Sequence, residues 1–487
     1  MRNWFLIILG ALLISGIPLS GQNISFSQEI QYCFFNLDTL KGNKLLAQHY
    51  SSNDPEYIRL ISYRDFIRNL LYQSRSGFEL FSNQSAIRIK RLEKLQSPGN
   101  TAMVSIAEIY LYQAILAWQF SDFKLAFTDL VSSYKIVAKW GSDFKAGDRN
   151  KLSGILGVLF QLVPEQYEKY LRVVGVRPKA LSGYNGLDRY YTASSPGTIE
   201  RQEGYLLLIT AYKEFRLDPS TAWNFVKMEG KPMLDSPLIR YQSALAALKA
   251  GDCESAVKLL DYHTSESGRP VFPLWTYQLG RCKLYQNDTM AGGFLERFLK
   301  NPGGDNYMHS ALLMSGWNCL MHGNQAQAKV FFLRSKNLPT PFTMYDKQAL
   351  NEAGSDKMPD VELLKVRLQF DGGYYEKCLD NCDKLLVTNR FHGQEKGELL
   401  YRKGRCEQRL LRTEPAIRSF LGVIERADSI KSYLVPNSAL QLGYLYKKAG
   451  QVDLARKYFQ LSLDLNKYGY REGINRQAQS ALDELSN

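Results

Sequence analysis

The chain has 487 residues, of which 45% are hydrophobic and 12% aromatic, so global disorder is excluded and a sizeable core is expected. Its formal net charge is +13, and no run of five or more like charges occurs. A basic surplus without such a run indicates a soluble protein with solvated Lys and Arg side chains, and a preference for anionic partners is the alternative.

The first 21 residues predict a signal peptide. Arg2 precedes an apolar run over residues 4–17, which is too short for a comfortable membrane span, and Pro18 ends it. Cleavage before Gln22 would release an exported protein, and an uncleaved anchor is the alternative. The first cysteine is Cys33, so no lipid-attachment cysteine is placed to make a lipoprotein. We expect export to the periplasm, with secretion or outer-membrane association as alternatives.

The N-terminal part predicts helices. Residues 24–96 follow helical spacing throughout. Residues 101–135 then predict a helical hairpin, because Ala114 and Ala126 are small residues on either side of a turn at Ser121. The expected apolar partners in this hairpin are Tyr110, Leu111, Ile115, Trp118, Phe123 and Leu130.

Residues 141–200 depart from this pattern, because the position twelve residues after Gly157 is Lys169 and the small pair fails. The segment predicts short helices punctuated by Pro164, Gly175, Gly183 and Gly186. The run Ser-Ser-Pro-Gly at residues 194–197 is the best candidate for a boundary.

From about residue 200 the hairpins return, as pairs of small residues twelve apart. The pairs are Thr210/Ala222, Ala244/Ala256, Gly280/Gly292, Gly316/Ala328, Val366/Cys378, Gly404/Ala416 and Gly443/Ala455. Four of them have a glycine at the predicted turn: Gly251, Gly323, Gly373 and Gly450. The spacing between the repeats at Gly316 and Val366 is longer, at 50 residues. This longer segment contains Leu-Pro-Thr-Pro at 338–341 and the polar residues 351–359, and it predicts a loop with one extra turn of helix.

These patterns predict an all-α fold, an irregular solenoid of helical hairpins without a significant β-sheet. The expected organisation is a signal peptide at 1–21, an N-terminal helical region at 22–140, an irregular segment at 141–200 and a repeat array at 201–487.

The repeats resemble the tetratricopeptide repeat family, whose unit favours small residues at its eighth and twentieth positions, Gly at its fifteenth and an aromatic residue at its twenty-fourth. Gly443, Gly450, Ala455 and Phe459 match all four positions. The central segment is also similar to the tetratricopeptide family linked in eukaryotes to inclusion-body clearance, and the chain resembles exported Bacteroidetes-type repeat proteins of unknown role. Neither of these two resemblances implies a catalytic residue.

The tetratricopeptide resemblance implies a concave groove lined by the first helix of each hairpin. Its candidate binding residues are Tyr241, Tyr277, Arg281, Trp317, Tyr401, Arg405, Tyr444 and Lys448. An aromatic and basic lining suits an extended peptide, a carboxylate terminus or an acidic glycan. The alternative is that the tyrosines pack against the next repeat. The family's peptide-carboxylate clamp is not implied, because Arg, Trp and Tyr stand where it uses Asn.

Motifs for chemistry are lacking. The sequence has no phosphate-binding glycine loop, no zinc-protease motif and no nucleophile elbow, and its five histidines are scattered. We therefore expect no catalytic residue, no cofactor and no metal site, and no nucleic acid as a partner. An enzyme site in residues 141–200 is the minority hypothesis, since Glu165, Glu168 and Asp188 have no evident partner there.

The sequence thus favours a non-enzymatic exported scaffold that binds a protein or peptide in its concave groove, with peripheral association with the cell envelope as an option. The alternative is an outer-membrane-associated glycan-capture protein. The sequence indicates neither the partner nor the oligomeric state.

Overall fold

The computed structural model describes residues 25–95, 99–161, 168–216, 218–230, 233–261, 272–355, 357–467 and 471–485. Within these ranges every regular element is helical and none is a strand, which confirms the predicted all-α fold. The predicted signal peptide and its cleavage site lie outside the described residues.

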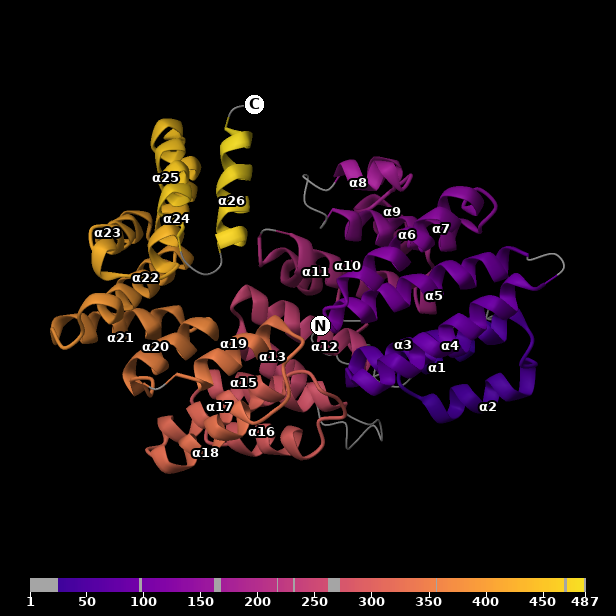
Figure 1. The fold of residues 1–487 in the computed structure, drawn as a ribbon, viewed down its shortest axis with the longest axis horizontal. Coiled ribbons are helices and arrows are strands. Elements are labelled where there is room, and N and C mark those ends of the chain that lie inside the picture. Colours follow the sequence, from indigo (N-terminus) through magenta and orange to yellow (C-terminus); the bar gives the residue numbers. More distant parts are fainter. Residues whose placement is uncertain are drawn as a thin grey trace, which may run out of the picture.

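The N-terminal region forms the right-hand arm in Figure 1. Its helices are α1 (Phe26–Phe35), α2 (Thr39–His49), α3 (Pro55–Tyr72), α4 (Arg75–Glu93), α5 (Asn100–Gln119) and α6 (Phe123–Trp140). The Asp54 side chain caps α3 and Pro55 occupies its first turn, where a missing N–H costs nothing. The predicted hairpin is α5 with α6, and Ser121 takes a positive φ of 58° at its turn.

Helix α5 is the central helix of this arm, and α3, α4 and α6 pack against it. By length and composition it could cross a membrane, but 78% of its apolar window is buried inside the fold, as expected for a core helix. Its one buried carboxylate, Glu108, bonds Arg59 Nε at 2.8 Å and Lys151 Nζ at 2.6 Å. Lys151 also approaches Glu203 at 3.4 Å. This buried network therefore ties α3 and α5 to later helices.

The irregular segment contains two helices joined by glycine contacts, with a short helix and a 3₁₀ turn between them. The elements are α7 (Ala146–Phe160), α8 (Glu168–Val173), η2 (Pro178–Ala180) and α9 (Tyr184–Ala193). A Cβ on Gly154 would lie 2.8 Å from the Leu187 nitrogen, and one on Gly157 would lie 2.6 Å from the Gly183 nitrogen. Since only a residue without a side chain fits there, α7 and α9 approach at backbone distance. This pairing replaces the small pair that fails in the sequence.

The repeat array follows as paired helices, which confirms the predicted hairpins. The elements are α10 (Ile199–Phe215), α11 (Thr221–Glu229), α12 (Pro237–Ala250), α13 (Cys253–Leu260), α15 (Pro273–Tyr285), α16 (Ala291–Lys300), α17 (Met308–Met321), α18 (Gln325–Lys336), α19 (Met344–Ala353), α20 (Val361–Asp371), α21 (Tyr375–Val387), α22 (Gly393–Arg409), α23 (Thr413–Ile424), η4 (Ala427–Ser429), α24 (Leu434–Lys448), α25 (Val452–Leu465) and α26 (Arg471–Glu484).

Small residues bring the two helices of a hairpin together. A Cβ on Gly443 would lie 2.5 Å from Phe459 Cε1, and one on Gly404 would lie 2.9 Å from Phe420 Cε1. The aromatic ring of the second helix thus fills the space that the glycine leaves in the first. The four predicted turn glycines all adopt positive φ, between 73° and 83°.

The long step between α18 and α20 differs from the prediction. The sequence predicted a loop with one extra turn of helix, whereas α19 is a ten-residue helix that begins at Met344 with Thr343 as its cap. The Asp346 carboxylate of α19 accepts hydrogen bonds from the backbone nitrogens of Tyr307 and Ser310 at 2.6 and 2.9 Å. These bonds hold α19 against the start of α17, so the insert is part of the packed array.

The array curves back so that its middle repeats meet the N-terminal arm (Figure 1). The Asp305 nitrogen donates to the Gln73 carbonyl at 3.1 Å, and the Asn306 amide donates to the Gln73 side chain at 2.9 Å. Beside them the rings of Phe120 and Phe342 meet edge to face, with centroids 5.5 Å apart. We call this the closure contact. It joins the α3–α4 and α5–α6 turns to the loops that precede α17 and α19.

Candidate functional site

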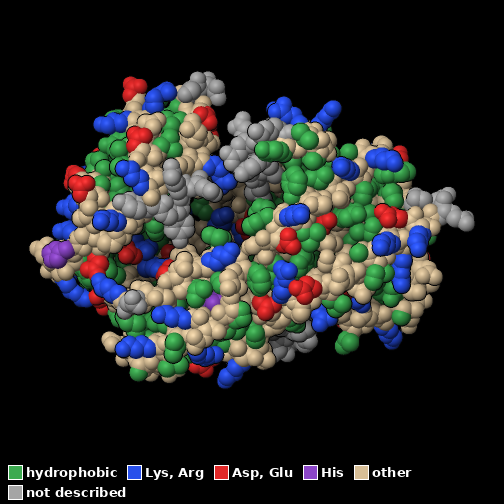
Figure 2. Space-filling model, viewed as in Figure 1, with side chains coloured by type: hydrophobic (Ala, Val, Ile, Leu, Met, Phe, Trp, Pro, Cys, Tyr) green, Lys and Arg blue, Asp and Glu red, His purple; other side chains and the backbone are tan. Residues whose placement is uncertain are grey.

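A cavity of about 1390 Å³ lies inside the curve of the chain. We call the helices after α21 the C-terminal arm. Figure 2 shows a hollow between this arm and the N-terminal arm, with Lys and Arg side chains visible within it. On one side the cavity is lined by α5, α6, α7 and α10, and on the other by α12, α15 and α19–α22. The closure contact keeps these two sides facing each other.

The N-terminal side of the cavity is apolar. We define the apolar wall as Ile115, Trp118, Phe123, Phe127, Leu130 and Leu159. Trp118 and Phe123 are 56% and 55% exposed, and their rings meet edge to face with centroids 5.1 Å apart. Exposed aromatic side chains gathered inside a concavity are typical of surfaces that bind apolar groups.

The sequence predicts Trp118 and Phe123 as apolar partners within the α5–α6 hairpin, and their rings do meet there. Their exposure to solvent was not predicted. The helical spacing identifies the apolar face correctly, but α3 and α4 cover a different face of α5. The face that carries Trp118 is left open toward the cavity. Nothing in local periodicity reports which face a distant element covers.

The opposite side carries positive charge and tyrosines. We define the arginine wall as Arg281, Arg405 and Arg409 with the surrounding Tyr285, Tyr307, Tyr345 and Tyr375. Among the described residues, no carboxylate lies within ion-pair distance of these three arginines. The Nε atoms of Arg281 and Arg405 are buried, and neither has a hydrogen-bond partner in the described part of the chain. Arg405 does donate from Nη1 to the Tyr401 hydroxyl at 3.0 Å.

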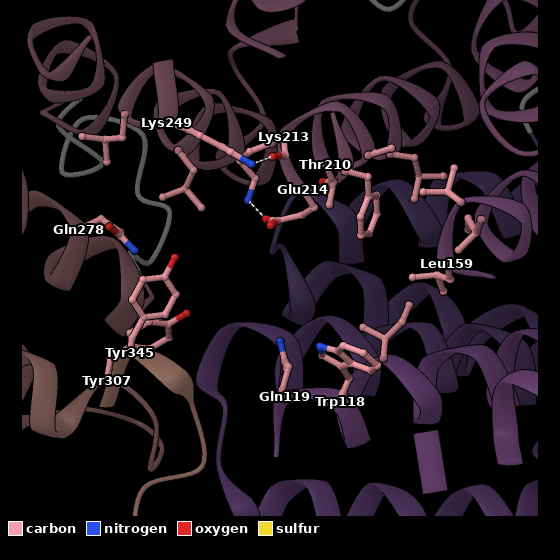
Figure 3. Close-up of a pocket in the computed structure, with 18 of the residues that line it drawn as sticks. Trp118, Gln119, Leu159, Thr210, Lys213, Glu214, Lys249, Gln278, Tyr307 and Tyr345 are labelled. Carbon is pink, nitrogen blue, oxygen red and sulfur yellow. Dashed lines mark hydrogen bonds and ion pairs between the residues drawn. The ribbon is translucent and has the colours of Figure 1, made fainter. Parts of the chain in front are cut away.

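Besides the two walls, the lining has a cluster of charged side chains, Lys213, Glu214 and Lys249, which lies at the top of Figure 3. Lys249 donates to the main-chain carbonyl of Lys213, and Lys213 forms an ion pair with Glu214. Burial, the largest contribution, lowers the pKa of Lys249. The same view places Tyr307 and Tyr345 across the cavity from Trp118. The cavity therefore separates an apolar surface from a cationic and phenolic one.

Four of the eight predicted groove residues are buried between repeats. Tyr241 stacks on Trp275 at 6.1 Å, and the Tyr277 hydroxyl lies 2.9 Å from Ser310 Oγ. Burial raises the pKa of Tyr277 to about 12. The other two are also buried. The Arg367 guanidinium lies over the indole ring of Trp317, and the Asn437 amide donates a hydrogen bond to the Tyr401 hydroxyl.

The other four predicted residues are accessible to different degrees. Arg281 and Arg405 line the cavity. Tyr444 is half-buried against the Phe459 ring, with centroids 5.2 Å apart, and Lys448 is exposed on the last turn of α24. Neither Tyr444 nor Lys448 belongs to the cavity lining. A binding role for any of the eight stays a prediction.

Several lining residues escaped the sequence analysis. Arg409 follows Arg405 by one helical turn, so it belongs to the same face of α22, and this spacing could have suggested it. Tyr345 belongs to α19, which the sequence did not predict as a helix of this length. Phe127 follows Phe123 at helical spacing, which by itself predicts a core face.

Comparisons with known proteins add little. No protein-family model matches the chain, and no curated protein is similar enough in sequence to match it. Among solved structures, the chain is similar to the APC/C hetero-tetramer Cut9–Hcn1 with 11% identity, a TM-score of 0.23 and coverage of 96% of this chain and 99% of that one. Yeast Tom70 gives 12% identity, a TM-score of 0.25 and coverage of 94% and 96%. A monomeric mutant of IFIT1 with m7Gppp-AAAA gives 13% identity, a TM-score of 0.20 and coverage of 96% of this chain and 95% of that one. Superpositions this weak carry no argument about function.

Proposed function

We propose that this protein is an exported, non-enzymatic scaffold that binds a segment of a protein partner in its central cavity. The observation that carries the proposal is the cavity itself, in which exposed aromatic side chains face three arginines that have no carboxylate partner within the described ranges. Apolar burial supplies affinity at such a surface, and unpaired guanidiniums supply specificity for acidic groups.

The chemistry of the lining supports binding over catalysis. The lining has no His, Cys or Ser side chain among the described residues. Its two carboxylates are both engaged, Glu214 with Lys213 and Asp371 with Arg367. Lys249, whose pKa burial lowers, donates to the Lys213 carbonyl, and Lys213 pairs with Glu214, so these ionisable groups are bonded to one another. A sugar ring could stack on Trp118, but the aliphatic side chains of the apolar wall, Ile115, Leu130 and Leu159, match a protein segment better.

Affinity capture from the envelope fraction of the source cell tests the proposal. The bait is residues 22–487, compared with a cavity-charge variant (Arg281→Gln, Arg405→Gln, Arg409→Gln) and an outer-charge variant (Arg297→Gln, Lys329→Gln, Arg334→Gln). Both variants remove three positive charges, but the second set is exposed and lies outside the cavity lining. We expect one identified protein to be retained by the wild type and the outer-charge variant only. Equal retention by all three baits contradicts binding in the cavity.

Export is tested separately. The proposal predicts that the protein recovered from the periplasmic fraction begins at Gln22, which intact-mass measurement checks. A chain recovered with Met1 in the cytoplasmic fraction contradicts export but leaves binding in the cavity unaffected.

A further inference from the structure

We infer that the cavity takes a short amphipathic helix of the partner, with its apolar face on the apolar wall and its acidic face on the arginine wall. This inference rests on the proposed function and names the class of partner. It follows from three features of the cavity: its size, the polarity of its walls and the arrangement of its arginines.

The size suits a short segment. An α-helix about 10 Å wide that fills 1390 Å³ is about 18 Å long, which corresponds to about 12 residues at 1.5 Å per residue. A folded domain is too large for this space. About three turns of helix fill it, and the rest of the partner would remain outside.

The walls favour a helix over an extended strand. The lining residues lie on helices, apart from Gly251 and Tyr307 at helix ends, and the described lining presents no strand edge. Near the apolar wall, Gln119 and Thr210 are the polar side chains that could bond the backbone of an extended segment. The Thr210 hydroxyl already donates to the Leu206 carbonyl at 2.8 Å. An extended segment there would bury backbone groups without partners, whereas a helix brings its own hydrogen bonds.

The charges fix the second face. The lining carries five cations, Lys213, Lys249, Arg281, Arg405 and Arg409, against two carboxylates that are already engaged. The buried Nε atoms of Arg281 and Arg405 are unpaired donors within the described chain, and a buried donor without an acceptor is costly. These Nε atoms are closed to the cavity, but both guanidiniums are partly exposed in its lining, and carboxylates of a bound segment would pair with their accessible atoms.

The spacing of the arginines sets the spacing of the acids. Arg405 and Arg409 lie one turn apart on α22, about 6 Å along its axis. Two acidic residues at positions i and i+4 of a bound helix are separated by the same rise. The inferred partner segment therefore has Asp or Glu at i and i+4 on one face and large apolar residues on the other.

Designed peptides test this inference in purified form. The probe is a fluorescein-labelled, C-terminally amidated helix of about 14 residues, with Leu on one face and Glu at i and i+4 on the other. A permuted peptide of identical composition has no amphipathic face. By fluorescence anisotropy we expect the probe to bind residues 22–487 at least about tenfold more tightly than the permuted peptide.

Variants then assign the two faces. The cavity-charge variant should bind the probe at least about tenfold more weakly, with a shallower dependence of affinity on salt. A Trp118→Ala/Phe123→Ala variant should also bind more weakly, with the salt dependence unchanged. The outer-charge variant should bind within about twofold of wild type, since its charges lie outside the cavity. Circular dichroism confirms that each variant is folded; because Trp118 and Phe123 are more than half exposed, their truncation leaves the core intact.

Four results would overturn the inference. The first two are equal binding of the permuted peptide and equal weakening of probe binding in the outer-charge variant. The other two are binding only when the probe ends in a free carboxylate, and displacement of the probe by dodecanoic acid at a far lower concentration than by unlabelled probe. The last would identify an acyl chain as the occupant. If a native partner is captured through the cavity but the probe does not bind, the helix inference fails while the proposed function stands.

Discussion

The glycine–phenylalanine contact inside a hairpin leads to a graded prediction. In Gly443→Ala the new methyl group would lie 2.5 Å from Phe459 Cε1, whereas carbon atoms normally approach to about 3.5–4.0 Å. The Phe459 ring must therefore move by about 1 Å. It is fully buried, so its neighbours resist the movement.

The magnitude follows from two opposing terms. Overpacking a filled core costs about 1–3 kcal/mol, and replacing a helical glycine by alanine gains about 1 kcal/mol. Gly443→Ala should therefore destabilise its hairpin by about 1 kcal/mol. In Gly404→Ala the nearest ring atom is at 2.9 Å, so the two terms should nearly cancel. Gly293→Ala, with no atom within 4 Å of the new methyl group, should stabilise α16 by up to about 1 kcal/mol.

Native-state hydrogen exchange is the appropriate assay, because a long repeat array does not unfold in one step. Each variant is compared with wild type in the peptides of its own hairpin. Phe459→Leu in the Gly443→Ala background should recover part of the lost protection, as a double-mutant cycle. If Gly443→Ala is as well protected as wild type and Phe459→Leu brings no recovery, the ring does not occupy the space that the glycine leaves.

Three further predictions concern the framework around the cavity. Arg59 and Lys151 outweigh burial and lower the pKa of Glu108 from 4.5 to about 2. The stability that Glu108 contributes is therefore present above pH 4.5 and lost as the pH falls toward 2, and Glu108→Gln should lower the thermal midpoint at pH 7 by much more than at pH 2.5. Burial, with a smaller effect of Asp122, raises the pKa of Asp129 from 3.8 to about 7, so the cost of its ionisation is absent below pH 3.8, grows as the pH rises, and is complete above about 7. Asp129→Asn should then raise the midpoint at pH 8 and leave it unchanged at pH 3.5, and equal shifts at both values would contradict this. Gly304→Ala places a methyl group 2.5 Å from the Gln73 carbonyl oxygen, so it should open the closure contact and increase the radius of gyration in solution scattering, whereas an unchanged radius would show that this contact does not hold the curve.

The sequence predicts the local units of this fold well, because each hairpin is specified by residues close together in the chain. Gly443 and Phe459 belong to one repeat, and their contact follows from helical spacing alone. The turn glycines take the left-handed conformation for the same local reason. A ten-residue α19 was missed because its polar composition resembles a loop, and its bonds to the start of α17 are tertiary.

The candidate site could be predicted only in part. Arg281 and Arg405 follow from the repeat pattern, and both line the cavity. Tyr241 and Tyr277, which occupy the same position in successive repeats, were also predicted to line the groove. They are buried, because neighbouring hairpins pack over them. Trp118 was predicted as an apolar partner within its hairpin, but its place in the cavity lining depends on elements that are distant in the sequence. Periodicity identifies a face, and only the long-range path of the chain decides what that face meets.

The closure contact also constrains how such a chain can change in length. An open array tolerates the duplication of a unit, because each unit touches only its neighbours. Here the turn at Gln73 is bonded to the loop at Asp305, so the hairpins between them form a loop of fixed circumference. Gain or loss of one would pull the two ends out of register. Natural duplications should therefore accumulate beyond α21, in the free C-terminal arm.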